Sequence, residues 1–565
     1  MNPQMLTRKQ MFHSRETIVS CPGKVLIAGG YLVLDRAYPG IVVGTSSRFY
    51  TVIKPAPLLP DESLEQADLK YPQIRLSIRS PQFINAEWSY LISLSAQDHL
   101  IVEPDTSSSQ NTFVELAVRE SLKLSLALQT LDQFILHRPL GKSDQNGRSV
   151  NQPYPMTITI LGDNDFYSQP RHDDARVAPF NRLNTTLKDV HKTGLGSSAA
   201  MVTSLCSAIL VHFSPSVDPQ SRSTKLLLHN LSQYVHSLAQ GKVGSGFDVS
   251  AAVYGTHVYR RFSPSCLDGL LASSGDQVDL APEQLRKALD PKINPSWVDP
   301  STAGAIERFS IPKFTTLLLA DVDAGSHTPS MVGKVFKWKN SETEIAGQIW
   351  NELSIQNNQI KVAFARLTSL SNMDEKNYLS EVLKLSIDSG FHLQQDPSPV
   401  TETDDVRTLF IKVSSISKAI RQLMKKMGSK SNVPIEPDSQ THLLDECERR
   451  QGVVGSGVPG AGGYDAIWVL VFTPPPLPAS PVAAQVEERS GNILIRNVMD
   501  FLNDWPHSSV RVLSPDSWVV GGSSTRKKAL TPLGSDDDCH DGDGIMIFND
   551  LKLVDSLKSQ LDLFS

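Results

Sequence analysis

Cysteine is scarce in this sequence, and the cysteines that occur form no site pattern. There are five of them and no CxxC pair: Cys21, Cys206, Cys266, Cys447 and Cys539. An odd and scattered set excludes a disulfide framework and a thiolate zinc site, and it is typical of a reducing compartment. We therefore expect a cytoplasmic protein.

Long apolar runs are absent as well. No stretch approaches the length that crosses a bilayer, and residues 1–17 carry charges but lack the apolar core of a secretory signal. Residues 562–565 match neither a peroxisomal nor a retention tail. The sequence predicts no membrane partner.

An excess of positive charge is also missing. The chain has 54 Lys and Arg against 60 Asp and Glu, a formal net charge of −6, and no basic block. Such a mildly acidic chain is a poor candidate for nucleic-acid binding, so we expect none. An anionic ligand would have to be held by a local cluster of donors and not by the field of the whole molecule.

The chain does have length and a regular succession of apolar segments. Its 565 residues exceed what one hydrophobic core supports, so two domains are expected. β-Branched runs broken by Pro-Gly and Gly-Gly pairs predict strands within 17–54. Apolar residues at helical spacing predict helices that include 199–213 and 406–427.

Composition also predicts where the domains begin and end. Polar stretches are expected to be surface insertions or loops, and the Gly-, Ser- and Asp-rich segment near the C-terminus is expected to be disordered. The last residues have the spacing of an amphipathic helix. The segments are 1–16 (N-terminal extension), 17–309 (first domain, with an insertion near 263–301), 310–514 (second domain), 515–544 (disordered acidic segment) and 545–565 (C-terminal helix).

The most informative segment is 194–200, with the sequence GLGSSAA. Its two glycines let the backbone approach a ligand, and the helix that follows offers free N–H groups and the positive end of its dipole to a phosphate. Ser197 and Ser198 add hydroxyls that can donate to phosphate or face Mg²⁺. The segment is not a Walker A loop, because no Gly-Lys-Ser/Thr follows. Taken alone, the same pattern also suits a helix N-cap.

A lysine and an aspartate stand beside further glycines. Lys24 follows a Pro-Gly pair at the start of an expected strand, so rigid backbone can aim it; a solvated lysine in a turn is the alternative. Asp248 follows a Gly-Phe pair and precedes small apolar residues. A half-buried carboxylate needs a partner, and Lys24 would serve, whereas a simple helix cap is the alternative for Asp248.

A third glycine-rich segment, 455–465, has the sequence GSGVPGAGGYD and precedes an apolar strand. Glycines at this density indicate close backbone packing or approach to a ligand. By itself such a segment is more often a structural turn.

The order of these segments resembles the motif order of the GHMP kinase superfamily. Lys24, the loop 194–200, Asp248 and the glycines of 459–463 follow one another in that order, and the resemblance spans about residues 18–512. Within the superfamily the sequence resembles the fungal-type phosphomevalonate kinases. That likeness rests on the segments Ala28–Asp35, Ile160–Gln169, Lys192–Gly194, Gln240–Gly246, Gly325–Val332 and Pro434–Pro437.

The resemblance implies an α+β, two-domain GHMP kinase fold. Its N-terminal domain would be ribosomal-protein-like and its C-terminal domain ferredoxin-like, with ATP and the acceptor meeting between them. The implied activity is ATP-dependent phosphorylation of (R)-5-phosphomevalonate to 5-diphosphomevalonate in the mevalonate pathway, with Mg²⁺. The implied partners are these small molecules, and the protein would be a monomer or a homodimer.

The resemblance also implies roles for single residues. Lys24 and Asp248 would be catalytic and flank the transferred phosphoryl group, and Ser197 and Ser198 would contact the metal. Residues implied to bind ATP are Lys192, Gly194, Leu195, Gly196, Ser197, Ser198, Ala199 and Ala200. Residues implied to bind the acceptor are Tyr31, Ser245, Ser326, Thr328, Ser330, Gly460 and Gly462. For Lys192, ligand contact and simple solvation both stay open.

The chemistry of a phosphate acceptor fits two features of the chain. A phosphate monoester has its second pKa near about 6, so its attacking oxygen is already largely deprotonated at neutral pH. Asp248 then has little proton to remove, and positive charge should dominate catalysis. Mevalonate kinases usually carry Glu-His where this chain has Gly30-Tyr31, which we expect to leave room for a second phosphate.

One departure and three alternatives remain. Several GHMP relatives use a Glu before the catalytic Asp as a metal ligand, but no acidic residue lies between Thr224 and Asp248, and Gln240 is the nearest polar candidate. Mevalonate kinase and diphosphomevalonate decarboxylase activities are the alternatives within the superfamily. A non-catalytic ligand sensor on the same fold is the third.

Overall fold

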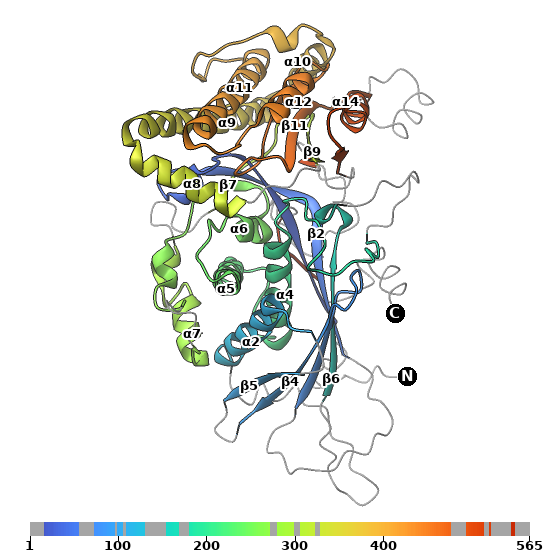
Figure 1. Cartoon of the computed structure of the whole chain (residues 1–565), viewed down its shortest axis with the longest axis vertical. Coiled ribbons are helices and arrows are strands. Elements are labelled where there is room, and N and C mark those ends of the chain that lie inside the picture. The colour runs from blue at the N-terminus through green and yellow to red at the C-terminus, as the bar shows by residue number, and fades with distance from the viewer. Residues whose placement is uncertain are drawn as a thin grey trace, which may run out of the picture.

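The chain folds into two halves, each built around its own sheet, and they lie one above the other in Figure 1. The structure is a computed structural model, which describes residues 16–55, 73–95, 99–105, 109–129, 154–168, 180–271, 279–298, 306–322, 328–475, 493–513, 519–520 and 544–548. The change from one sheet to the other falls between β8 (Glu307–Arg308) and β9 (Thr315–Val322).

The N-terminal sheet is built on two long antiparallel neighbours, β1 (Thr17–Ala28) and β2 (Gly40–Pro55). Both are rich in β-branched and aromatic residues, which pack well on a pleated surface. The remaining strands of this sheet are β3 (Ile74–Arg79), β4 (Glu87–Leu94), β5 (Leu100–Pro104), β6 (Tyr154–Gly162), β7 (His257–Tyr259), β8 and β14 (Met546–Phe548). Among the described residues the order is β14-β1-β2-β6-β3-β4-β5, and β7 pairs with both β2 and β8.

Helices cover one face of this sheet (Figure 1). They are α2 (Thr112–Ala127), α4 (Ser197–Phe213), α5 (Arg222–Gln240), α6 (Phe247–Tyr254) and α7 (Pro282–Leu289). Helix α4 packs on β1 and β2 and between α2 and α5. Because α4 is apolar on all sides it is buried along almost its whole length. The helix predicted at 199–213 is confirmed and begins two residues earlier, at Ser197.

Helix α7 lies inside the stretch predicted as a surface insertion or loop, 263–301. Leu285 and Leu289 are fully buried, and Trp297 stacks on Phe262 with ring centroids 5.3 Å apart. The polar composition hid this helix because a short amphipathic helix needs apolar residues on one face only.

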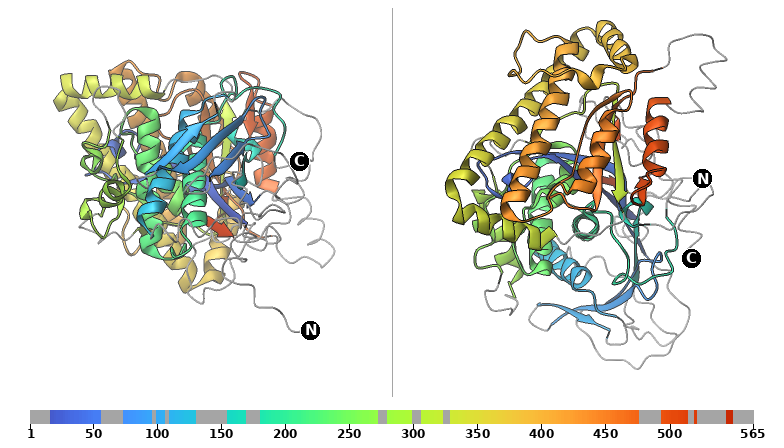
Figure 2. Two further views of the ribbon diagram at one scale, coloured as in Figure 1. Left: turned by 90° about the horizontal axis from the view of Figure 1, so that it is seen from below. Right: turned by 45° about the horizontal axis from the view of Figure 1, so that its top comes forward.

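The C-terminal half combines a sheet with long helices. Its strands are β9, β10 (Val453–Gly457), β11 (Ala466–Phe472), β12 (Val510–Val512) and β13 (Val519–Val520). Its helices are α8 (Thr328–Ser341), α9 (Thr343–Met373), α10 (Glu375–Ile387), α11 (Val406–Ser431), α12 (Asp438–Glu448) and α14 (Ile493–Asn503). The long helices α9 and α11, yellow and orange in Figure 2, pack against each other. None of the described helices is long and apolar enough to cross a membrane.

The order of strands in this second sheet identifies its type. The order is β10-β11-β9-β12, and along the chain helices follow β9 and β11. That is the split β-α-β arrangement of the ferredoxin-like fold. The predicted α+β class and the ferredoxin-like C-terminal domain are therefore confirmed.

The last described segments return to earlier sheets. β13 pairs with β9, and β14 pairs antiparallel with the edge of β1, with Ile18 opposite Phe548. Disorder over 515–544 is therefore wrong at Val519–Val520, and a helix over 545–565 is wrong at Met546–Phe548. The exposed backbone groups of β1 explain the strand, because a short apolar segment can satisfy them. The rest of both segments lies outside the described residues, apart from Gly544 and Ile545.

Candidate active site

Lys24 is aimed by an irregularity in its strand. The ladder between β1 and β2 shifts register between Pro22 and Lys24, and such a bulge redirects the side chain. The backbone N–H of Lys24 donates to the carbonyl of Leu195 at 2.9 Å, and its Nζ donates to the carbonyl of Gly194 at 2.7 Å. The lysine of the first motif is therefore bound directly to the second glycine-rich loop.

Gly196 shows how closely three segments converge. A Cβ placed on this glycine would lie 3.0 Å from Cγ and 3.2 Å from Cε of Lys24, and 3.6 Å from Cβ of Asp248. Gly196 also has a φ of 78°, in the left-handed region that favours glycine. The structure thus brings Lys24, the loop 194–200 and Asp248 together.

The loop leaves its ligand-facing side open. Gly194, with a φ of 77°, is exposed, and a Cβ on it would meet nothing within 4 Å. Within the described part of the chain no side chain caps α4, whose N-cap is Gly196. Free N–H groups and the positive end of a long buried helix therefore face this space, which is the arrangement that binds phosphate. The simple helix-cap interpretation does not account for the open side.

Asp248 lies in the first turn of α6 and is half-buried. Gly246, the N-cap, has a φ of 78°, and its carbonyl accepts from Nε2 of Gln233 at 2.7 Å. A Cβ at Gly246 would lie 2.7 Å from the Phe262 ring, so only glycine fits there without a shift. The Asp248 carboxylate accepts the N–H of Val249 at 2.9 Å.

The charge of Lys24 is incompletely compensated. Burial lowers the pKa of Lys24 below its ordinary value, and the carboxylate of Asp248 acts in the opposite direction. The ammonium also lies 5.3 Å from the centroid of the Phe247 ring. The pKa of Lys24 is thus lowered even though a carboxylate lies nearby. A further anion in the site would stabilise the charged form of the lysine.

His236 is a site residue that the sequence interpretation missed. Its Nε2 lies 3.1 Å from Oγ of Ser198 and 3.1 Å from Nε2 of Gln240. His236 and Gln240 are four residues apart on α5, and residues at that spacing share one helix face. This spacing, together with Gln240 as the nearest polar candidate, is the signal that could have found it.

The donor set for a metal is small. Ser197 is buried and Ser198 is half-buried at the start of α4, and the described residues contain no group of three or more His, Cys, Asp or Glu that could hold a metal ion. Lys192 pairs through its backbone with Tyr167 and has an exposed side chain at the rim of the loop. The residues present fit a Mg²⁺ ion that arrives with nucleotide phosphates, which takes few protein ligands.

On the opposite side, the third glycine-rich loop touches the end of β1. Gly460 N–H donates to the carbonyl of Leu26 at 3.0 Å, and Oη of Tyr31 donates to the carbonyl of Ala461 at 2.8 Å. Tyr31 is buried and has a φ of 62°, which is strained for a bulky residue. Strain of this kind persists only where the surroundings fix the conformation.

Gly30 is packed and leaves no room. A Cβ at Gly30 would lie 2.4 Å from the carbonyl oxygen of Gly460 and 2.7 Å from Cε of Met424. The expectation that Gly30 frees space for a second phosphate is therefore wrong at this atom, because the loop fills that space. The absence of a carboxylate from this position still removes a negative charge.

The other residues implied to bind the acceptor lie in different surroundings. Ser326 lies outside the described residues, and Thr328 begins α8. Ser330 is exposed, next to Met331, which packs in one cluster with Tyr31. The carbonyl of Ser245 accepts from Oη of Tyr259. Gly462 is pressed against a carbonyl of its own half, 2.1 Å from its would-be Cβ, whereas Gly460 faces open space.

Arg261 connects two segments of the N-terminal half near Tyr31, and the sequence interpretation missed it as well. It donates to the carbonyl of Leu34 at 2.6 Å and to that of Gly244 at 2.7 Å. Val33 and Phe247 pack in one apolar cluster. The segment that follows Tyr31 is thus tied to the loop that precedes α6 and Asp248.

Known proteins resemble the chain over most of its length. The family description "GHMP kinases N terminal domain" matches residues 181–256, which contain the open loop and Asp248. Phosphomevalonate kinase ERG8 of Gibberella zeae is 36% identical over 461 residues, 80% of this chain and 87% of that protein. "Phosphomevalonate kinase, peroxisomal" of Arabidopsis thaliana is 34% identical over 489 residues, 80% and 90% of the two chains. The solved Lin0012 protein of Listeria innocua has the same fold, with a TM-score of 0.51 at 16% identity, covering 88% of this chain and 97% of that one.

Proposed function

The chain belongs to the phosphomevalonate kinase family, and from that premise we propose that it transfers the γ-phosphoryl group of ATP to (R)-5-phosphomevalonate. A phosphate oxygen of the acceptor forms a bond to the γ-phosphorus. The bond between that phosphorus and the β–γ bridging oxygen breaks, and its electron pair leaves with ADP. The product is 5-diphosphomevalonate, an intermediate of the mevalonate pathway.

The observation that carries the proposal is the convergence of Lys24 and Asp248 beside Gly196. In this proposal the N–H groups at the start of α4 bind the ATP phosphates, and Lys192 contacts them from the rim. The Lys24 ammonium neutralises charge that builds up on the transferred group. Because this charge lies in a partly desolvated site, its effect on the transition state is large.

Asp248 has a smaller role in this proposal than in kinases that act on alcohols. The acceptor phosphate has already lost its second proton at neutral pH, since its second pKa is near about 6. Asp248 then orients Lys24 and accepts the remaining proton only from the minor, protonated acceptor. We expect its loss to reduce the rate less than the loss of Lys24.

Mg²⁺, when bound with ATP, supplies positive charge between the phosphates. We propose that the hydroxyls of Ser197 and Ser198 are the groups of this chain that contact it. His236, within hydrogen-bond distance of Ser198, would orient that hydroxyl. Gln240 contacts the same Nε2 of His236 and is therefore one step removed from the metal.

A screen of acceptors tests the proposed function. The protein is incubated with ATP, Mg²⁺ and either mevalonate, its 5-phosphate or its 5-diphosphate, while ADP and CO₂ are measured. We expect ADP with the 5-phosphate alone and no CO₂. ADP with mevalonate alone, CO₂ release with the diphosphate, or nucleotide binding without turnover would each replace the proposal by a named alternative.

We also propose that the enzyme works in the cytoplasm. The four described cysteines, Cys21, Cys206, Cys266 and Cys447, are all free and buried, which suits a reducing compartment. The Arabidopsis relative is named peroxisomal, so microscopy of the tagged full chain is the direct test.

A further inference from the structure

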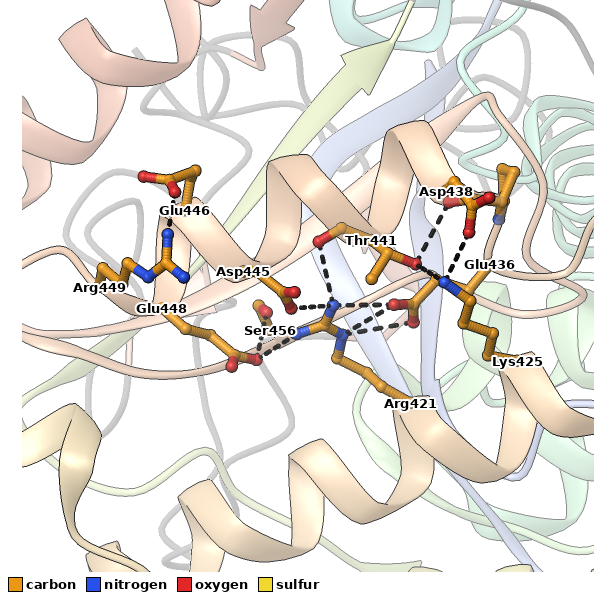
Figure 3. A network of polar contacts seen from close by, with 11 residues as sticks. Arg421, Lys425, Glu436, Asp438, Thr441, Asp445, Glu446, Glu448, Arg449 and Ser456 are labelled. Atoms are coloured by element: carbon orange, nitrogen blue, oxygen red, sulfur yellow. Dashed lines mark hydrogen bonds and ion pairs between the residues drawn. The ribbon is translucent and has the colours of Figure 1, made fainter.

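Arg421, on α11, lies at the centre of a network of charged side chains (Figure 3). It is 6% exposed, and its guanidinium donates to Glu436 at 2.8 Å, to Glu448 at 2.7 Å and to Asp445 at 2.8 Å. Although burial alone would lower it, hydrogen bonds and the charge of Glu436 raise the pKa of Arg421 above its ordinary value. A single buried cation therefore holds two buried carboxylates, Glu436 and Glu448, and each would be costly without it.

Glu436 in turn fixes the residue before it. Ile435 lies within the Pro-Ile-Glu-Pro segment 434–437, where the two prolines restrict the backbone. The carbonyl of Ile435 accepts the N–H of Gly463 at 2.9 Å, and a Cβ on Gly462 would lie 2.1 Å from the same oxygen. The peptide that Arg421 anchors through Glu436 is thus the peptide on which the third glycine-rich loop rests.

The other side of that loop contacts the N-terminal half. Gly460 donates to Leu26 and Ala461 accepts from Tyr31. A continuous chain of contacts therefore leads from Arg421 through Ile435 and the loop to Tyr31. The strained backbone of Tyr31, with a φ of 62°, needs such support, because a bulky residue at positive φ is unfavourable on its own.

We propose that Arg421 and Glu436 are positioning residues for the acceptor: they hold Ile435, and Ile435 holds the loop 459–463 against Tyr31. The inference rests on the proposed function, because it takes the Tyr31 side of the site as the side of the acceptor. Misplacement of a substrate by about 1 Å can lower a rate by about 100-fold. The open loop 194–200 belongs to the other half and makes none of these contacts, so ATP binding should not depend on the network.

Helix α11 offers a matched control for a purely structural role. Lys412, toward the N-terminal end of the same helix, is 2% exposed and donates to Asp404 at 2.6 Å and to the carbonyl of Pro399 at 2.8 Å. This is also a buried cation with a carboxylate partner, but it contacts loop 396–405 and not the glycine-rich loop. Asp404→Asn and Glu436→Gln make the same chemical change in the two pairs.

The first measurement is steady-state kinetics of the full chain with the substrates varied in turn. We expect Glu436→Gln to raise KM for phosphomevalonate about tenfold and to leave KM for ATP within about twofold. Arg421→Lys keeps the charge but not the fork of donors, so we expect the same change at smaller size. Asp404→Asn should leave both KM values unchanged. Unchanged acceptor KM in Glu436→Gln and Arg421→Lys, or equal changes for both substrates, would overturn the inference.

The second measurement does not need turnover. Hydrogen exchange of the peptide that contains Gly460–Gly463 should become about tenfold faster in Glu436→Gln and stay as in the parent protein in Asp404→Asn. If the parent protein does not phosphorylate phosphomevalonate, the proposed function fails. The hydrogen-exchange measurement still tests the contacts that lead from Arg421 to Tyr31. Equal exchange in Glu436→Gln and the parent would refute the chain of contacts itself.

Discussion

The two glycine-rich loops of the site have similar composition and opposite surroundings. In the N-terminal half, Gly194 faces open space in front of an uncapped helix. In the C-terminal half, Gly462 is pressed against the carbonyl of Ile435. Glycine gives room for a ligand in the first loop and allows close backbone packing in the second. Glycine density alone therefore does not separate a binding loop from a supporting one.

The cations of the two halves differ in the same way. Burial lowers the pKa of Lys24, with one carboxylate nearby, whereas the pKa of Arg421 is raised despite burial, by Glu436 first. Arg421 already has its counter-charges, while Lys24 has room for an incoming anion. The first cation is suited to a reaction and the second to support.

The largest effect should come from Lys24→Met. We expect turnover to fall about 1000-fold or more, because a charge that acts mainly on the transition state is removed, while nucleotide binding is retained. Turnover of the Asp248→Asn variant should fall less, by about 100-fold.

Arg421→Met should instead destabilise the fold, by about 3 kcal/mol or more of unfolding free energy. Kinetics and denaturant unfolding of the three variants measure this, and an unimpaired Lys24→Met enzyme would remove the contrast.

The next effect separates the glycines. Gly462→Ala should cost about 2–3 kcal/mol of unfolding free energy, because its Cβ would overlap the Ile435 carbonyl. Gly194→Ala should cost only about 1 kcal/mol, from its positive φ, and should weaken ATP binding. Unfolding curves and nucleotide titration compare the two. Equal losses of stability, with ATP binding intact in both, would show that the loops do not differ.

A third effect concerns pH. Burial lowers the pKa of His229 and of His257, both in the N-terminal half, to about 4. The unfolded chain then binds more protons between pH 6.5 and 4, so stability falls as the pH falls through that window. At pH 5 each of these two histidines should lower the free energy of unfolding by about 2 kcal/mol relative to pH 7.

Hydrogen exchange can locate this acid sensitivity. The described histidines of the C-terminal half, His392, His442 and His507, are partly or fully exposed. We therefore expect amides near α5 and α6 to lose protection at a higher pH than amides of α11. Earlier loss in α11 would contradict the assignment, and His442→Asn serves as the neutral control.

Local chemistry explains which elements the sequence predicted. Strand β1 and helix α4 follow from β-branched runs and from an apolar stretch after Gly-Ser, and the motif order brought Lys24, the open loop and Asp248 into one hypothesis. The three converge as that hypothesis requires.

Several of the errors and omissions share a physical cause, which is contact between distant segments. β14 is a strand because β1 offers it a free edge, which no local spacing reveals. Gly30 looks like free space until Gly460 from the other half fills it. Arg421 lies on α11 and Glu436, 15 residues later, in the connection that follows that helix, and only the fold makes them partners.

The most direct test is the structure of the protein with Mg²⁺ and a non-hydrolysable ATP analogue. The account predicts that the triphosphate lies on the N–H groups of Gly194–Ser198, with its terminal phosphate beside the Lys24 ammonium. A triphosphate bound on Gly460–Gly463, or one whose terminal phosphate is out of reach of Lys24, would contradict it.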